Sequence, residues 1–307
     1  MFRLFVVIGS ILLWGGISSG FVSSDEHKSD GLSEEVKKLS RSTEWKQVEK
    51  IDLDFNIHHP QGMTKIGDLY YISSVEILEE TEQYEEPKGG YERSPGEGIG
   101  HLFIIDEEGN LVEDLELGED DMYHPGGIAY DGEYIWVPVS EYRPDSHSII
   151  YKVDPKTKEV TKEFEADDHI GGIVKDEKNN NIYGVNWGSR QLYEWNGKGE
   201  LKSVQDNNSH FIDYQDCEGV DKGNMLCTGL AELTADTDET YELGGLALLN
   251  KKTKEIQHEI PISEFSSNNH NITRNPVFVE KMEKGLRLFG VPDDDYASLY
   301  IYETETQ

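Results

Sequence analysis

The sequence predicts an all-β protein, a β-propeller of five four-stranded blades, and two observations lead to this prediction. A short motif around Gly-Gly-apolar recurs along the chain, at residues 59–63, 124–128, 169–173, 216–220 and 273–277. Once polar insertions at 79–98 and 234–242 are set aside, the copies recur about every 45 residues, which is the size of a propeller blade. Repeats of that length indicate a ring of equivalent sheets.

Each motif precedes two runs rich in aromatic and β-branched residues, which are typical of buried strands. The second strands are expected from residues 68, 133, 181, 224 and 286, and the third strands from residues 101, 148, 190, 245 and 298. A charged outer strand follows in every copy except the last, where the chain ends.

The N-terminal segment 45–55 resembles the outer strands, so it is predicted to complete the last blade and close the ring. A six-bladed ring is the alternative, with its extra blade inside the insertion at 79–98. That insertion is rich in Glu, Gly and Pro, which is typical of a loop.

The N-terminus has the three parts of a secretory signal. Arg3 is followed by an apolar run at 4–14 and by small residues at 15–20. We therefore expect a signal peptide at 1–24, a flexible polar lead or one short helix at 25–44, and a single propeller domain at 45–307. The expected location is extracellular, with no stable membrane span after cleavage. The alternative is a membrane anchor formed by the uncleaved N-terminal segment.

The charge excludes some partners. With 61 acidic and 28 basic residues the formal net charge is −33, so nucleic acid and anionic membranes would be repelled, whereas divalent cations would be attracted. We expect a monomer that binds a small molecule or a glycan.

The two cysteines, Cys217 and Cys227, lie in one short segment with a turn at 222–224 midway between them. A hairpin there would place them opposite each other, and an oxidising compartment would favour a disulfide. Two small buried residues are an alternative structural interpretation. A reactive thiol or a metal pair is the other alternative, although the CxxC spacing is absent.

Equivalent residues of a propeller converge around its axis, so the motifs predict a ring of polar side chains at the channel mouth. The register proposed from sequence aligns His59, His124, His169 and Asp216 with Thr273, and places Glu218 and Asn275 two positions further on. Imidazole and carboxylate suit Zn²⁺ or Mn²⁺, whereas Glu218 and Asn275 suit Ca²⁺. Two alternatives stay open: histidines that hydrogen-bond the backbone of the linkers, or acid–base catalysis by His124 and His169 without a metal.

Charged residues near the same mouth are candidate ligand-binding groups. Glu76, Glu141 and Glu232 end the second strands, and Arg190 and Arg274 lie close to the predicted channel. An arginine there could hold a substrate carboxylate, with Arg190 also a catalytic candidate, or it could pair with Asp or Glu.

Three segments, GVNWGSRQLYEW, HFIDYQDCEGV and TRNPVFVE, resemble a secreted bacterial and fungal propeller family of unknown function. The blade openings are also distantly similar to gluconolactonase and regucalcin-like propellers. That resemblance implies a central divalent cation held by Glu, Asn and Asp side chains, for which Glu218 and Asn275 match, while Gln61, Gly126 and Gly171 depart from the pattern.

The expected function is that of an exported propeller that binds a small molecule at the channel mouth, with a divalent metal and lactonase-like or other hydrolase activity. The alternative is a non-enzymatic extracellular scaffold for protein or glycan.

Overall fold

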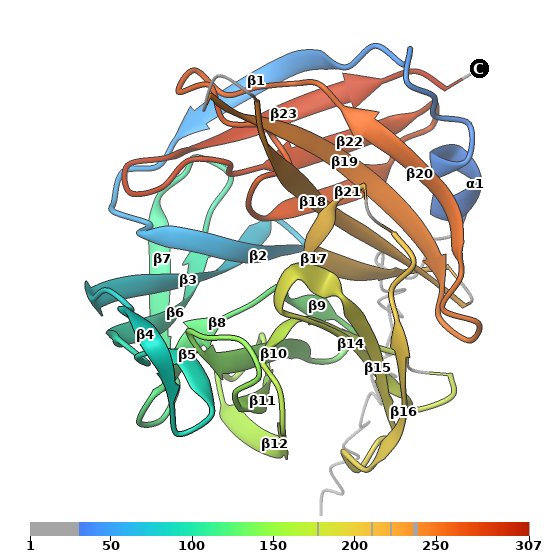
Figure 1. The fold of residues 1–307 in the computed structure, drawn as a ribbon. Helices are drawn as coiled ribbons and strands as arrows, with labels where there is room; N and C mark the ends of the chain where they lie inside the picture. The colour runs from blue at the N-terminus through green and yellow to red at the C-terminus, as the bar shows by residue number, and fades with distance from the viewer. Residues whose placement is uncertain (1–30, 177, 210, 222, 236–238, 307) are drawn as a thin grey trace, which may run out of the picture.

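The protein is a five-bladed β-propeller (Figure 1). The computed structural model describes residues 31–176, 178–209, 211–221, 223–235 and 239–306. The signal peptide predicted at 1–24 lies outside these residues. The predicted blade number is confirmed, and the sixth blade considered for the insertion at 79–98 does not form.

Each blade is an antiparallel sheet, and in the first four blades the strands run outward from the axis in chain order. The first comprises β2 (His59–Ile66), β3 (Leu69–Glu79), β6 (Glu97–Ile105) and β7 (Leu111–Leu117). The second comprises β8 (Met122–Pro125) and β9 (Ala129–Tyr130), both beside β10 (Ile135–Glu141), then β11 (Ser148–Val153) and β12 (Val160–Ala166). The third comprises β13 (Ile170–Lys175), β14 (Ile182–Asn186), β15 (Gln191–Trp195) and β16 (Leu201–Asp206). The fourth comprises β17 (Asp213–Val220), β18 (Asn224–Thr234), β19 (Thr240–Asn250) and β20 (Ile256–Ile262).

The fifth blade joins the two ends of the described chain. Its inner strands are β21 (Val277–Lys281), β22 (Leu286–Gly290) and β23 (Ser298–Thr304), and its outer strand is β1 (Lys46–Asp52). Strand β1 pairs antiparallel with β23, from Lys46 opposite Glu303 to Asp52 opposite Ser298. The predicted closure by segment 45–55 is therefore confirmed, and it satisfies the ladder that β23 would otherwise expose.

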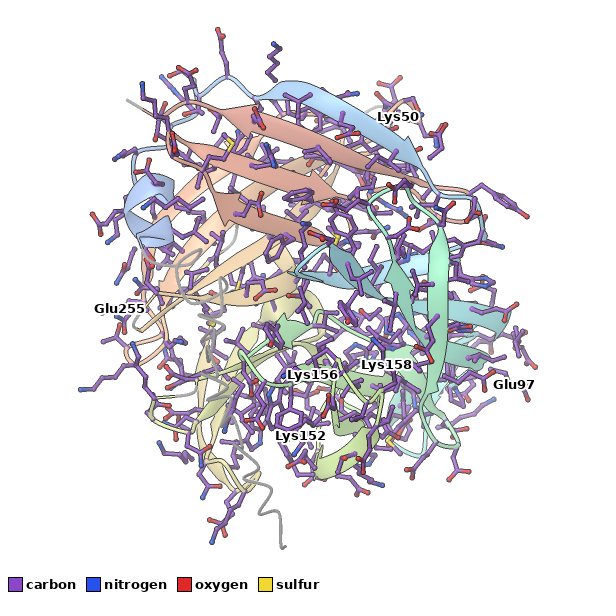
Figure 2. All side chains as sticks on the ribbon, turned by 180° about the vertical axis from the view of Figure 1, so that it is seen from behind. Lys50, Glu97, Lys152, Lys156, Lys158 and Glu255 are labelled. Carbon is purple, nitrogen blue, oxygen red and sulfur yellow. A yellow bond between two sulfur atoms is a disulfide. The ribbon has the colours of Figure 1, made fainter. Side chains whose placement is uncertain are left out.

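The core is distributed between blades. Five clusters of buried apolar side chains join neighbouring sheets, as Leu102 of the first blade and Val137 of the second do. Charged side chains such as Lys50, Glu97 and Glu255 project from the periphery (Figure 2). Because each sheet buries both faces, its central strands are the continuous apolar runs seen in the sequence.

Part of the segment expected to be a flexible lead or a short helix lies in the described region, where it contains one short helix. Helix α1 (Leu32–Val36) buries Leu32 and Val36 against the interface of the fourth and fifth blades. The Asp221 carboxylate accepts hydrogen bonds from the backbone N–H groups of Gly31 and Ser33, each at 2.7 Å. These bonds satisfy donors that the start of a helix leaves unpaired.

The insertion at 79–98, interpreted from its composition as a loop, is instead largely β-structure. Strands β3 and β6 extend into it, and β4 (Gln83–Lys88) pairs with β5 (Tyr91–Arg93). Aromatic contacts hold this hairpin: the Arg143 guanidinium lies 3.5 Å from the centre of the Tyr91 ring. The amino-acid composition of the insertion did not predict this hairpin, because the contact that holds it depends on a residue of the next blade.

The predicted disulfide is present. Cys217 on β17 is directly opposite Cys227 on β18, with 4.1 Å between their Cα atoms, and no free cysteine occurs among the described residues. Within the same part of the chain, no helix is long and apolar enough to cross a membrane.

Candidate functional site

A pocket of about 450 Å³ lies at one mouth of the central channel. All five blades contribute to its wall. Four do so through residues two positions apart, namely His59 and Gln61, His124 and Gly126, His169 and Gly171, and Asp213 and Gln215, and the fifth through the adjacent Arg274 and Asn275. Convergence of the blade openings, expected from the repeats, thus brings His59, His124, His169, Arg274 and Asn275 together.

The register proposed for the fourth blade needs a correction. The ladders of β2, β13 and β17 each skip one residue, namely Gln61, Gly171 and Gln215. Each skipped residue is a β-bulge, and the residue two positions before it is His59, His169 or Asp213, respectively. Asp213, and not Asp216, is therefore equivalent to the histidines, because the bulge and not the glycine pair fixes the register.

Asp216 occupies the position of Gly62 and Gly127 in other blades, and its carboxylate lies across the channel. One oxygen accepts the Met63 N–H at 2.7 Å, and the other accepts the Ile128 and Cys217 N–H groups at 3.0 Å each. Burial raises the pKa of Asp216 to about 8, although these hydrogen bonds favour the charged form. Asp216 therefore ties three blades together at the axis.

Glu218 lies two residues further along β17. Its side chain is partly exposed, yet Oε1 is buried without a hydrogen-bond partner. Burial raises the pKa of Glu218 well above its ordinary value, Thr64 lowers it by a hydrogen bond, and the neighbouring Asp216 raises it further. Neither Asp216 nor Glu218 lines the pocket.

The three histidines of the pocket have different environments. His59 Nδ1 lies 2.8 Å from Asp294 Oδ1. His169 Nδ1 donates to the Glu141 carbonyl at 2.8 Å, which is the backbone contact anticipated for a structural histidine. His124 differs from both, since its two ring nitrogens are buried and have no partner.

Burial favours the neutral form of two of these imidazoles. It lowers the pKa of His169 to about 4 and that of His124 well below its ordinary value, where neighbouring His169 and His59 lower it further. A neutral imidazole has one donor and one acceptor. With His169 Nδ1 donating, its Nε2 is an acceptor, while both functions of His124 are unused.

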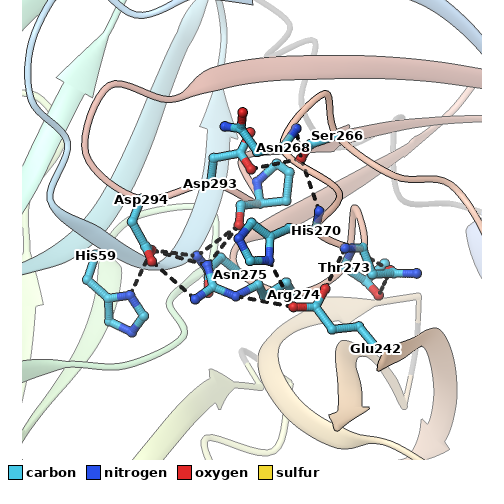
Figure 3. Close-up of polar contacts among 12 residues, drawn as sticks. His59, Glu242, Ser266, Asn268, His270, Thr273, Arg274, Asn275, Asp293 and Asp294 are labelled. Carbon is cyan, nitrogen blue, oxygen red and sulfur yellow. Dashed lines mark hydrogen bonds and ion pairs between the residues drawn. The ribbon is translucent and has the colours of Figure 1, made fainter. Parts of the chain in front are cut away.

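Arg274 belongs to a network of ion pairs at the rim (Figure 3). Its Nη2 lies 3.1 Å from Asp294 Oδ2, and its Nε lies 3.6 Å from Glu242 Oε1. Burial raises the pKa of Asp294, but the hydrogen bonds and charges of His59 and Arg274 outweigh it and hold this pKa well below its ordinary value. Two roles were considered for Arg274, binding of a substrate carboxylate and pairing with Asp or Glu. In the structure Arg274 is paired with Asp294 and Glu242.

The other charged candidates are also paired or lie elsewhere. Arg190 Nη2 is 2.5 Å from Asp213 Oδ1, and Glu141 forms a buried ion pair with Arg143. Glu232 lines the pocket at its exposed edge. Glu76 does not line the pocket and faces His101 instead, with 4.0 Å between Oε2 and Nε2.

An aromatic wall of Tyr142 and Trp187 completes the pocket, and neither residue belongs to the ring of polar side chains predicted from the motifs. The rings of His124 and Tyr142 stack with centroids 4.2 Å apart, and Trp187 lies 5.7 Å from Tyr142 and 4.7 Å from His169. Trp187 directly follows β14, the second strand of its blade. Its position at the end of a second strand is the sequence feature that could have predicted its place at the channel mouth.

The side chains of the channel do not suit the cation expected for lactonase-like propellers. Two residues of the channel wall, Gly126 and Gly171, are glycines, which offer no side-chain ligand. Both Asp216 oxygens already accept backbone N–H groups, and an N–H donor repels a cation.

A family model described as "Family of unknown function (DUF6454)" matches residues 25–306. The chain belongs to this family. The predicted resemblance to a propeller family of unknown function is thereby confirmed. No curated protein matches the chain of this DUF6454 member in sequence.

Solved structures resemble this DUF6454 member in fold alone. The tail fiber of Staphylococcus aureus phage P68 has a TM-score of 0.49 at 9% identity, over 90% of this chain and 56% of the fiber chain. The chain thus spans little more than half the length of that protein. A luciferin-regenerating enzyme has a TM-score of 0.47 at 9% identity, over 86% of this chain and 95% of its own. A hypothetical protein from Leishmania major has a TM-score of 0.44 at 10% identity, over 85% of this chain and 91% of its own.

Proposed function

We propose that the chain is an exported binding propeller whose channel-mouth pocket takes one small, uncharged polar molecule with a flat face, such as a sugar or a lactone. The observation that supports this most directly is His124, a residue of the pocket wall whose two buried ring nitrogens have no hydrogen-bond partner. An unsatisfied buried polar group costs about 1–3 kcal/mol. A ligand that offers both an acceptor and a donor would recover that cost.

The charges around the pocket favour an uncharged ligand. Asp213 is paired with Arg190, and Arg274 is paired with Asp294. A charged ligand would have to break one of these pairs or leave its own charge uncompensated. The rings of Tyr142 and Trp187 offer an apolar surface on which a sugar or lactone ring could lie.

Export is part of the proposal. It is supported by the signal-like pattern at 1–24 and by the disulfide, which is typical of oxidising compartments.

Hydrolysis of the bound molecule is a second candidate activity, favoured by the proximity of the two inner histidines. The ring centroids of His124 and His169 are 5.6 Å apart, and burial favours the neutral form of both by lowering their pKa. A neutral imidazole with a free lone pair can accept a proton from water, and the lowered pKa of both rings makes them weak general bases. A protein or glycan scaffold that binds through the surrounding loops would not need this arrangement.

His124→Phe tests the proposal, because phenylalanine preserves the stacking on Tyr142 and removes both nitrogens. We expect binding of uncharged monosaccharides and lactones, measured by isothermal titration calorimetry, to weaken at least tenfold, and any lactone hydrolysis in a pH-stat to fall with it. His147→Phe is the matched control, since His147 is half exposed and away from the pocket. Equal binding of these small molecules by wild type and His124→Phe would contradict the proposed binding site in the pocket. A protein or glycan that binds both proteins equally well would support the scaffold alternative.

A further inference from the structure

A second cluster of ligating side chains lies outside the pocket, on the first blade. His58 immediately precedes β2, Glu76 is on β3 and His101 is on β6, and one ligand atom from each lies within 4.8 Å of the other two. In the described part of the chain this is the one such group of three His, Cys, Asp or Glu side chains. None of the three lines the channel-mouth pocket.

The ladder between β3 and β6 places two of the ligands on one face. Ser74 is opposite His101 and Glu76 is opposite Ile99, so Glu76 and His101 are diagonal neighbours on the same side of the sheet. Their closest polar atoms, Glu76 Oε2 and His101 Nε2, are 4.0 Å apart. That separation is too long for a hydrogen bond. Two ligands of a tetrahedral ion with bonds of about 2.1 Å lie about 3.4 Å apart, so a small contraction would suffice.

His101 is held as a metal-binding histidine is usually held. Its side chain is 7% exposed, and Nδ1 contacts both Asp114 oxygens, at 2.9 and 3.1 Å. Its Nε2 is buried and has no hydrogen-bond partner. A carboxylate on one imidazole nitrogen fixes the ring and the tautomer, so that the lone pair of the other nitrogen points at the ion.

The third ligand is fixed by its backbone and by stacking. His58 has a φ of 60°, in the left-handed region that non-glycine residues seldom adopt. Its N–H donates to Asn56 Oδ1 at 2.8 Å, and its ring stacks on His101 with 5.4 Å between centroids. Strained backbone of this kind is concentrated at functional sites.

We propose that His58, Glu76 and His101 bind one first-row divalent ion such as Zn²⁺, with Asp114 positioning His101. Two imidazoles and a carboxylate suit Zn²⁺ and its neighbours, whereas Ca²⁺ and Mg²⁺ prefer oxygen ligands alone. Three protein ligands leave a fourth coordination position for water or another small ligand. The site is independent of the proposed pocket function.

The experiment is a calorimetric titration of tag-free, chelator-treated full chain with ZnCl₂ in excess CaCl₂, so that calcium occupies unspecific acidic sites. Wild type should bind one Zn²⁺ per chain. Glu76→Gln and His101→Gln should weaken binding at least tenfold, and Asp114→Asn about 10- to 100-fold. His147→Gln, at an exposed histidine paired with Asp167, should bind as wild type does.

Saturable binding that is the same in wild type and Glu76→Gln would overturn the site, as would no saturable binding by wild type. Glu76 is 36% exposed, so Glu76→Gln tests the ligand even where His101→Gln fails to fold. Co²⁺ in place of Zn²⁺ adds a visible spectrum, whose tetrahedral bands should disappear in the same variants.

Discussion

Asp216→Ala should lower the free energy of unfolding by about 3–5 kcal/mol, because it leaves three buried N–H groups unpaired at the axis. Each unsatisfied buried donor costs about 1–3 kcal/mol. Asp216 is fully buried and accepts from Met63, Ile128 and Cys217, which belong to three different blades. The loss should therefore appear in one cooperative transition measured by urea denaturation.

Asp167→Ala is the control for that measurement. Its side chain is fully exposed, and its only described ion pair, with His147, is 3.6 Å long. Surface changes of this kind are usually within about 0.5 kcal/mol. An Asp216→Ala variant as stable as Asp167→Ala would show that the axis is not held by this carboxylate.

Replacement of both cysteines by alanine should lower the free energy of unfolding by about 2–3 kcal/mol. The bridge closes a short loop, with a sequence separation of 10, and a cross-link of that size reduces the entropy of the unfolded chain by about this amount. Urea denaturation of the double variant measures the loss, and reduced wild type should show a similar one. If the double variant and oxidised wild type unfold at the same urea concentration with the same slope, the bridge does not stabilise the native protein.

Much of the architecture could be predicted from sequence, because a propeller repeats its local signals. The five motifs, the paired apolar runs and the outer-strand character of segment 45–55 each gave the correct element. The cysteine pair was predictable for the same reason, since a short turn fixes which residues of a hairpin face each other.

The candidate site was only partly predictable, because its details depend on register and on contacts between blades. The motif alignment matched the segment around Glu218 and Gly219 with the glycine motifs of the other blades. The bulge at Gln215 shows that the true equivalence is shifted by three residues, so that Asp213 and not Asp216 lies at the channel mouth. The aromatic wall and the second cluster each combine segments that no local pattern links. Glu76, expected at the channel, illustrates this, because its diagonal neighbour His101 belongs to another strand.

The pocket hypothesis is tested most directly by the stability of His124→Phe without any ligand. A histidine retained for binding has unsatisfied polar atoms that weaken the empty protein, so a phenylalanine of similar shape should raise the free energy of unfolding by about 1–2 kcal/mol in urea. A structural histidine would behave in the opposite way. A loss of 1 kcal/mol or more in His124→Phe, while His147→Phe stays close to wild type, would contradict the account.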